Sequence, residues 1–137
     1  EHVQPFLDLH YLYALARAGR GDKVNEMLAS LTVHAAAAPA LARTAWAEVA
    51  VPAARGLVAH AHGDYEAAYA DLGTATPRLQ EIGGSHAQRD LFVQTWLDTL
   101  LRTNRGGEAV DVFEARAKAR PNVPHGFDLW ERAQAQV

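Results

Sequence analysis

The sequence contains no cysteine, and among its 137 residues only one is isoleucine and one is methionine. Without thiols the chain can form neither a disulfide framework, a thiolate zinc site, an iron–sulfur site nor a cysteine nucleophile. Alanine, by contrast, occurs 28 times. Alanine has the best helix propensity, whereas sheets favour β-branched residues. The composition therefore predicts an all-α protein, and the length fits one domain over residues 1–137.

Long hydrophobic runs and an excess of basic residues are missing as well. Charged residues interrupt the apolar stretches well before the ~20 residues that a membrane-spanning helix needs; they include Arg17, Glu48, Arg55 and Asp98. The formal net charge of −3 gives no general attraction to phosphate backbones or anionic lipid. We therefore expect neither a nucleic-acid partner nor a membrane partner.

Signals for catalysis or for a cofactor are also lacking. No two of the seven histidines lie three or four residues apart, which is the spacing that places two ligands on one helix face. The sequence has no Walker-type glycine-rich loop, and Ser85 lacks the strand–turn–helix setting of a nucleophile elbow. We predict no catalytic residue, no metal and no cofactor.

The apolar periodicity predicts about seven amphipathic helices separated by glycine, proline or small residues. They group into three hairpins and a terminal helix, at residues 5–35, 41–82, 86–120 and 124–137. Asp22 is a candidate N-cap of the second helix. Pro52 predicts a kink or a short break near residues 50–56, because proline removes a backbone donor and clashes with the preceding turn. Gly73 and Pro77 predict a second kink.

The first helix carries two apolar stripes. One contains Phe6 and Leu9, and the other contains Leu7, Tyr11 and Ala14. A helix with two apolar faces is expected to have two packing neighbours. We therefore predict that both stripes are buried.

Three turns between helices repeat at a nearly constant interval. Their glycines, Gly21, Gly63 and Gly106, are 42 and 43 residues apart. Self-similarity at such a period, with a helix pair per unit, is typical of helical solenoids. In the third unit Ala109, Phe113 and Pro121 match the small, aromatic and terminating positions of a tetratricopeptide repeat. The fold that we predict is a tetratricopeptide-like solenoid of helical hairpins.

Three segments carry a more specific resemblance. They are the octapeptide at residues 83–90 (GGSHAQRD), the proline-bearing VAVP at residues 49–52 and FLDLHYL at residues 6–12. In this order they resemble the carboxy-terminal part of the tetratricopeptide repeat protein 38 family, and the resemblance covers most of residues 5–125. It implies a cytoplasmic helical-repeat protein with no established reaction that acts through contacts with other proteins. Because the sequence opens at Glu1 without an initiator methionine, we also expect it to be a piece of a longer repeat protein.

The octapeptide also holds the candidate site. Ser85 and Gln88 form the pattern of a capping box at a helix start, behind Gly83 and Gly84. His86 lies in the first turn, where free amides and the helix dipole could instead hold a phosphate or a carboxylate.

Arg89 and Asp90 follow one turn later in this octapeptide. We favour a structural role for them as a polar clamp to the first helix, through Asp8 or His10. The alternative is a general acid–base set in which Asp90, His86 and His10 converge.

Two functions from different classes remain open on this evidence. The first is a protein-interaction module whose groove, lined by the first helix of each pair, binds an extended or helical peptide of a protein partner. The second is part of an enzyme or a small-ligand-binding protein with its pocket in the candidate segment; the ligand- or partner-binding residues predicted there are Gly83, Gly84, Ser85, His86, Gln88, Arg89 and Asp90, with His10 beside them. Self-association through an apolar end of the solenoid is a further possibility.

Overall fold

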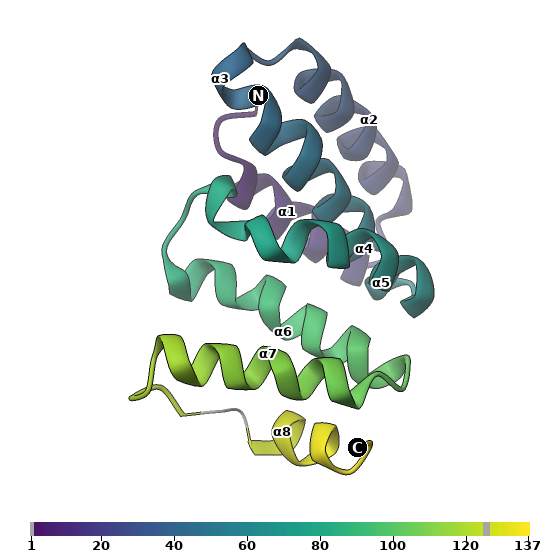
Figure 1. The fold of residues 1–137 in the computed structure, drawn as a ribbon. Helices are drawn as coiled ribbons and strands as arrows, with labels where there is room; N and C mark the ends of the chain where they lie inside the picture. The colour runs from purple at the N-terminus through teal and green to yellow at the C-terminus, as the bar shows by residue number, and fades with distance from the viewer. Residues whose placement is uncertain (1, 125–126) are drawn as a thin grey trace.

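The computed structural model describes residues 2–124 and 127–137, and within these residues the chain is helical with no strand (Figure 1). Its elements in chain order are α1 (Pro5–Arg17), α2 (Gly21–Ala37), α3 (Ala40–Thr44), the π-helical turn η1 (Ala45–Ala50), α4 (Val51–Ala61), α5 (Tyr65–Ala75), the 3₁₀ helix η2 (Thr76–Ile82), α6 (His86–Arg102), α7 (Gly106–Ala119) and α8 (Phe127–Gln134). Since α3, η1 and α4 follow one another without a break, as do α5 and η2, the described residues form seven helical segments. The all-α prediction and the number of helices are confirmed.

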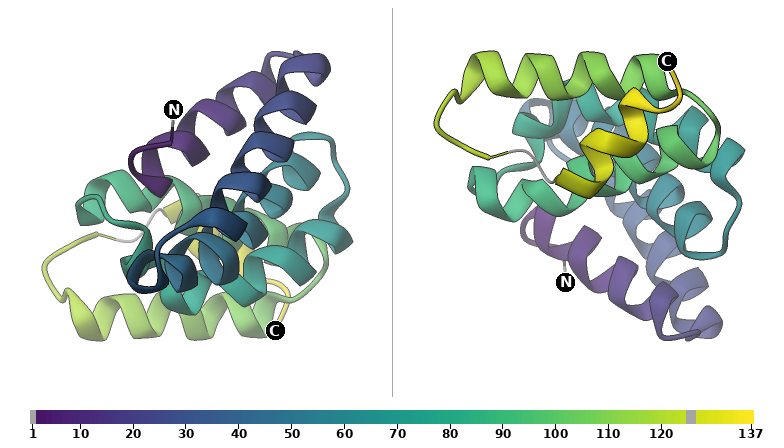
Figure 2. Two further views of the ribbon diagram at one scale, coloured as in Figure 1. Left: turned by 90° about the horizontal axis from the view of Figure 1, so that it is seen from above. Right: turned by 90° about the horizontal axis from the view of Figure 1, so that it is seen from below.

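The helices pack in order along the chain. α1 packs against α2 and α4, α4 packs against α5, and α6 contacts α4, α5, α7 and α8. Figure 1 shows α2 and α3 at one end of the molecule and α8 at the other, with α1 behind α4. Figure 2 shows α1 and α7 at opposite edges. One continuous apolar core runs through these layers, and its largest fully buried side chains include Leu9, Leu57, Phe92 and Phe113.

The two prolines act at different places. Pro52 does not break the helix over residues 51–56, which stays regular in α4, whereas Ala50 still belongs to η1. The chain widens one turn earlier, in η1, where the Val51 N–H donates to the Trp46 carbonyl five residues back. The wide turn therefore precedes the proline. At Pro77 the predicted kink is confirmed, because α5 changes into η2 and Arg78 leaves the helical region with φ −119° and ψ 15°.

Gly56 lets α4 and α5 approach closely. A Cβ at this position would lie 2.6 Å from the Leu72 Cγ and 3.0 Å from the Leu72 backbone nitrogen. Side chains larger than hydrogen do not fit at such distances. The tight contact between these two helices therefore depends on this glycine.

Two predictions about the first two helices are wrong, and one about the terminal helix falls partly outside the described residues. The second apolar stripe of α1 is exposed, with Leu7 at 43% and Tyr11 at 67%, because only the opposite face of α1 meets α2 and α4. Asp22 is not the N-cap of α2, since the helix begins at Gly21 and Asp22 lies in its first turn. Part of the predicted terminal helix, residues 125 and 126, lies outside the described residues.

Candidate functional site

The start of α6 forms the predicted capping box. The Ser85 hydroxyl accepts from the Gln88 N–H at 3.3 Å, and the Gln88 side-chain carbonyl accepts from the Ser85 N–H at 2.7 Å. Two backbone donors that an anion would need are thus bonded within the turn itself. The structure supports the capping role that the sequence favours for this pair.

The two glycines before the cap form a turn that Arg89 and Phe6 hold in place. Gly83 and Gly84 have φ values of 83° and 76°, in the left-handed region that favours glycine. The Phe6 ring covers Gly84, and a Cβ there would lie 3.1 Å from the Phe6 Cγ. Arg89 Nη1 donates to the carbonyls of both glycines, at 3.0 Å from Gly83. Arg89 is therefore bound to its own turn.

The predicted clamp to the first helix has other partners than expected. His10 donates from Nδ1 to the Phe6 carbonyl at 2.6 Å, and its ring meets the Phe92 ring edge-on at 4.9 Å. Asp8 accepts from Nδ1 of His2 at 2.8 Å. Neither His10 nor Asp8 is bonded to Arg89 or Asp90 within the described part of the chain, so the acid–base set with His10 does not converge.

Asp90 instead joins α6 to α7. Its carboxylate accepts from Nη2 of Arg116 at 2.5 Å and from the Gln94 side chain at 3.4 Å. The side chains of Asp90 and Arg116 are 40% and 29% exposed. The two residues of this pair lie 26 positions apart in sequence, and both line a hollow in the surface.

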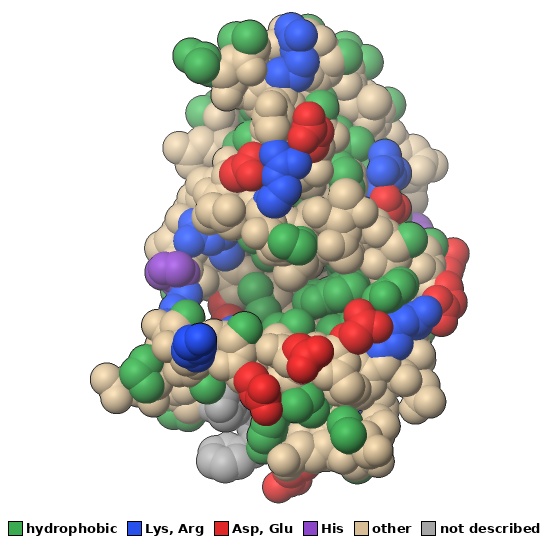
Figure 3. Space-filling model, viewed as in Figure 1, with side chains coloured by type: hydrophobic (Ala, Val, Ile, Leu, Met, Phe, Trp, Pro, Cys, Tyr) green, Lys and Arg blue, Asp and Glu red, His purple; other side chains and the backbone are tan. Residues whose placement is uncertain are grey.

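The hollow, which we call the groove, has a volume of about 920 Å³ and lies between α5 and η2 on one side and α7 on the other, with α6 at its base. Its floor is apolar and consists of Gly73, Val93, Trp96, Val112 and Phe113. Its polar rim contains Gln80, His86, Arg89, Asp90, Gln94, Arg116 and Arg120. Figure 3 shows this hollow below the middle of the view, with hydrophobic side chains inside and cationic side chains gathered toward its left end.

An aromatic stack supports the floor of the groove. Trp96 stacks on Tyr69 with ring centroids 5.4 Å apart and an interplanar angle of 18°. The Arg105 guanidinium lies over the other ring, 3.8 Å from the Tyr69 centroid. Gly73 leaves room for this tryptophan, because a Cβ there would approach its ring to 3.3 Å. Trp96 is only 8% exposed, so most of its ring is packed against neighbouring side chains.

The sequence prediction found His86, Arg89 and Asp90 of this rim and missed the α7 side. Arg116 and Arg120, the C-cap residue of α7, lie four residues apart, and both line the groove. Val112 lies one turn before Arg116 on the same face of α7. This spacing is visible in the sequence, and it is the signal that would have identified the α7 side of the groove. The first helices of the pairs were expected to line the groove, whereas its two walls come from the second helices.

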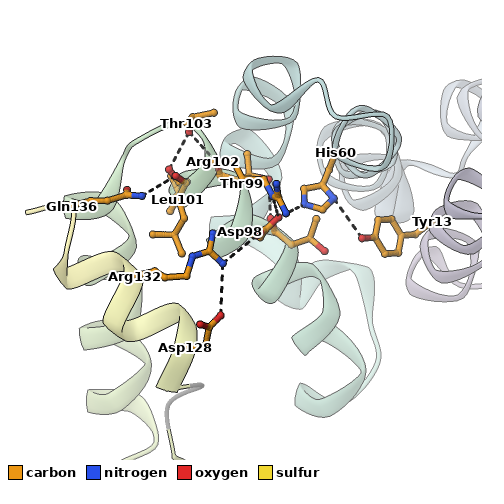
Figure 4. A network of polar contacts seen from close by, with 12 residues as sticks. Tyr13, His60, Asp98, Thr99, Leu101, Arg102, Thr103, Asp128, Arg132 and Gln136 are labelled. Atoms are coloured by element: carbon orange, nitrogen blue, oxygen red, sulfur yellow. Dashed lines mark hydrogen bonds and ion pairs between the residues drawn. The ribbon is translucent and has the colours of Figure 1, made fainter.

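A second polar cluster surrounds the buried His60, and we call it the His60 junction (Figure 4). His60 is 8% exposed and donates from Nε2 to Asp98 at 2.8 Å, while the Tyr13 hydroxyl lies 3.4 Å from its Nδ1. Arg102 Nε donates to the same Asp98 oxygen at 2.6 Å, and Arg132 of α8 lies 3.9 Å from the other oxygen. The junction therefore connects α1, α4, α6 and α8.

The charge of Asp98 is set by two opposing effects. Partial burial raises the pKa of this carboxyl, but the hydrogen bonds from His60 and Arg102 outweigh burial and hold the pKa below its usual value. Asp98 is therefore ionised at neutral pH. The junction therefore holds a charged group and its partners in place.

A third arrangement has the order of a Ser–His–Asp chain. Nε2 of His2 lies 2.7 Å from the Ser30 hydroxyl, and its Nδ1 bonds to Asp8. Acyl transfer at a serine also needs donors for the developing oxyanion. Ser30 lies in the middle of α2, whose regular bonding occupies the nearby amides, and Lys23 is paired with Glu26 at 2.7 Å. We interpret this chain as a tie between the start of α1 and α2.

Comparisons with protein-family models, with curated proteins and with solved structures found no match for this chain. Among the described residues, no group of three or more acidic or histidine side chains is placed to hold a metal ion. None of the described helices is both long enough and apolar enough to cross a bilayer.

Proposed function

We propose that this protein is a tetratricopeptide-like stack of helical hairpins that binds a segment of a protein partner in the groove. The order of helix contacts supports the repeat. α1, α4, α6 and α8 contact one another in succession, and the second helix of each hairpin also packs on the first helix of the next. In a solenoid successive units stack on one another in this way. Here the first unit also touches the third, where the His10 ring of α1 meets the Phe92 ring of α6.

The observation that carries the binding function is the groove itself. A volume of about 920 Å³ with an apolar floor and a polar rim accommodates several side chains of a peptide. Its walls, η2 and α7, belong to different hairpins and are held apart by the thickness of α6 (Figure 1). The stacking of hairpins therefore creates a binding surface that one hairpin alone would lack.

The test compares two alanine-to-tryptophan variants. Ala115 lines the groove and is exposed on α7, so Ala115→Trp fills the groove without disturbing the core. Ala29→Trp adds the same side chain to the exposed face of α2, away from the groove. We expect crosslinking with mass spectrometry to identify a partner of the wild type and of Ala29→Trp that Ala115→Trp loses. A survey that finds self-association alone, or a partner that Ala115→Trp retains, would contradict the proposal.

A second candidate function, small-ligand binding, is favoured by one observation: His86, Arg89 and Asp90 all line the same groove. A metabolite panel that shifts the melting temperature of the wild type, but not of His86→Ala, would support it. A panel without any shift would leave the peptide-binding function as the sole proposal.

A further inference from the structure

We propose that the groove selects a peptide in which an acidic side chain accompanies a large apolar one, and that Arg120 with Arg116 binds its carboxylate. This inference rests on the proposed peptide-binding function and adds the chemical class of the segment that is bound. It starts from the charges on the rim. Among the described residues, three arginines and a histidine line the groove against a single carboxylate, Asp90, in a chain whose net charge is −3. The groove is therefore locally cationic.

The three arginines of the rim differ in how many of their donor groups are already bonded within the chain. Arg89 donates from Nη1 to the carbonyls of the two glycines, and its Nη2 lies 3.5 Å from Nδ1 of His86. Arg116 gives Nη2 to Asp90. Arg120 ends α7 at its C-cap, is partly exposed, and has no carboxylate within ion-pair distance among the residues that the structure describes. Arg120 is thus a rim cation whose charge no described acidic residue balances.

The position of Arg120 determines which kind of peptide side chain lies next to the bound carboxylate. Arg120 lies one turn beyond Arg116 and two turns beyond Val112, and all three line the groove. A carboxylate bound at Arg120 therefore lies within a few residues of a side chain seated on Val93 and Val112. Arginine is suited to this role, because its planar guanidinium binds carboxylates with two parallel hydrogen bonds.

The apolar floor distinguishes an acidic peptide from other anions. A nucleic acid would be held by a basic surface that follows its phosphates, and the negative net charge opposes such binding. In the groove, the cations stand only at the rim and the floor offers Trp96, Val93 and Val112. An apolar side chain covers the floor while the acidic side chain meets the rim.

The experiment is a selection of random dodecapeptides displayed on phage against the full chain, followed by affinity measurement of synthetic winners by fluorescence anisotropy. We expect enrichment of Asp or Glu close to Leu, Ile, Phe or Trp. Arg120→Gln should weaken binding of the winners about tenfold, since one charge-assisted contact is lost. Lys118→Gln is the matched control, because it removes one positive charge from an exposed position of α7 that does not line the groove. It should leave the affinity within about twofold, since exposed charges contribute little.

The outcomes separate this inference from the function on which it rests. Peptides that lose binding on Ala115→Trp but show no acidic preference, or that bind Arg120→Gln as tightly as the wild type, overturn the carboxylate assignment and leave groove binding intact. Enrichment of basic peptides also overturns it, as does binding of single-stranded DNA to the same groove. Peptides that bind Ala115→Trp as well as the wild type, or no selected peptide at all, overturn both. Circular dichroism of each variant confirms that the comparison is between folded proteins.

Discussion

Two carboxylates on the same helix have opposite surroundings. Asp98 faces the His60 junction, where His60 and Arg102 bond to one of its oxygens and its side chain is 20% exposed. Asp90, eight residues earlier on α6, faces the groove and is 40% exposed with one short bond to Arg116. The first carboxylate holds helices from four parts of the chain together. The second carboxylate lies on the partly exposed rim of the groove, where we propose that a peptide binds.

The largest expected effect separates these two residues by stability. Asp98→Ala leaves the buried imidazole of His60 without its acceptor and removes two charge-assisted hydrogen bonds, and we expect a loss of about 2–3 kcal/mol in the free energy of unfolding. Asp90→Ala breaks a partly exposed pair and should cost less than ~1 kcal/mol. Both changes introduce alanine inside the same helix, so the difference in helix propensity cancels. Urea unfolding of the two variants measures the contrast, and equal losses would show that the junction and the groove are not distinct in this way.

The pH dependence of the free energy of unfolding tests the structural role of Asp98 further. The pKa of Asp98 is lowered in the folded state by its bonds to His60 and Arg102, which outweigh the effect of burial. Its contribution to stability is therefore fully present above the unfolded pKa near 3.8 and is lost as the pH falls through the lower folded value. We expect the stability difference between wild type and Asp98→Asn to shrink as the pH is lowered from 6 toward 3, measured by urea unfolding at each pH. A difference that stays constant over this range would contradict the assignment.

The smallest expected effect concerns binding rather than folding. Asp90 is the one carboxylate among the described residues that line the groove, and it accepts a hydrogen bond from Arg116. Asp90→Asn removes a negative charge that repels an acidic peptide and frees the guanidinium, so we expect selected acidic peptides to bind a few-fold more tightly. Fluorescence anisotropy at low and high salt measures this gain, which screening should reduce. Weaker binding by Asp90→Asn would mean that Asp90 accepts a bond from the peptide instead.

Much of the fold follows from local signals in the sequence. The capping box at Ser85 and Gln88, and the glycine turns near residues 21, 63 and 106, mark helix boundaries through short-range hydrogen bonds that depend on few residues. Pro77 likewise acts on the turn that contains it. Such signals are readable because the residues that make each contact are neighbours in the chain.

The remainder depends on how helices are placed in space. Leu7 and Tyr11 look like core residues, yet whether a neighbour covers them depends on which face of α1 packs against α2 and α4. The pairing of Asp90 with Arg116 depends on how α6 and α7 are rotated about their axes. Local sequence signals do not determine this rotation, and we therefore predicted His10 and Asp8 as the partners.

Chemical-shift mapping tests the binding site most directly. The backbone amides of the full, isotopically labelled chain are observed by NMR while the tightest selected peptide is added. We predict that the largest shifts fall on Val93, Val112, Ala115 and Arg120, while Leu7 and Tyr11 on the exposed face of α1 stay unchanged. Shifts concentrated on α1, with the groove unaffected, would contradict the account.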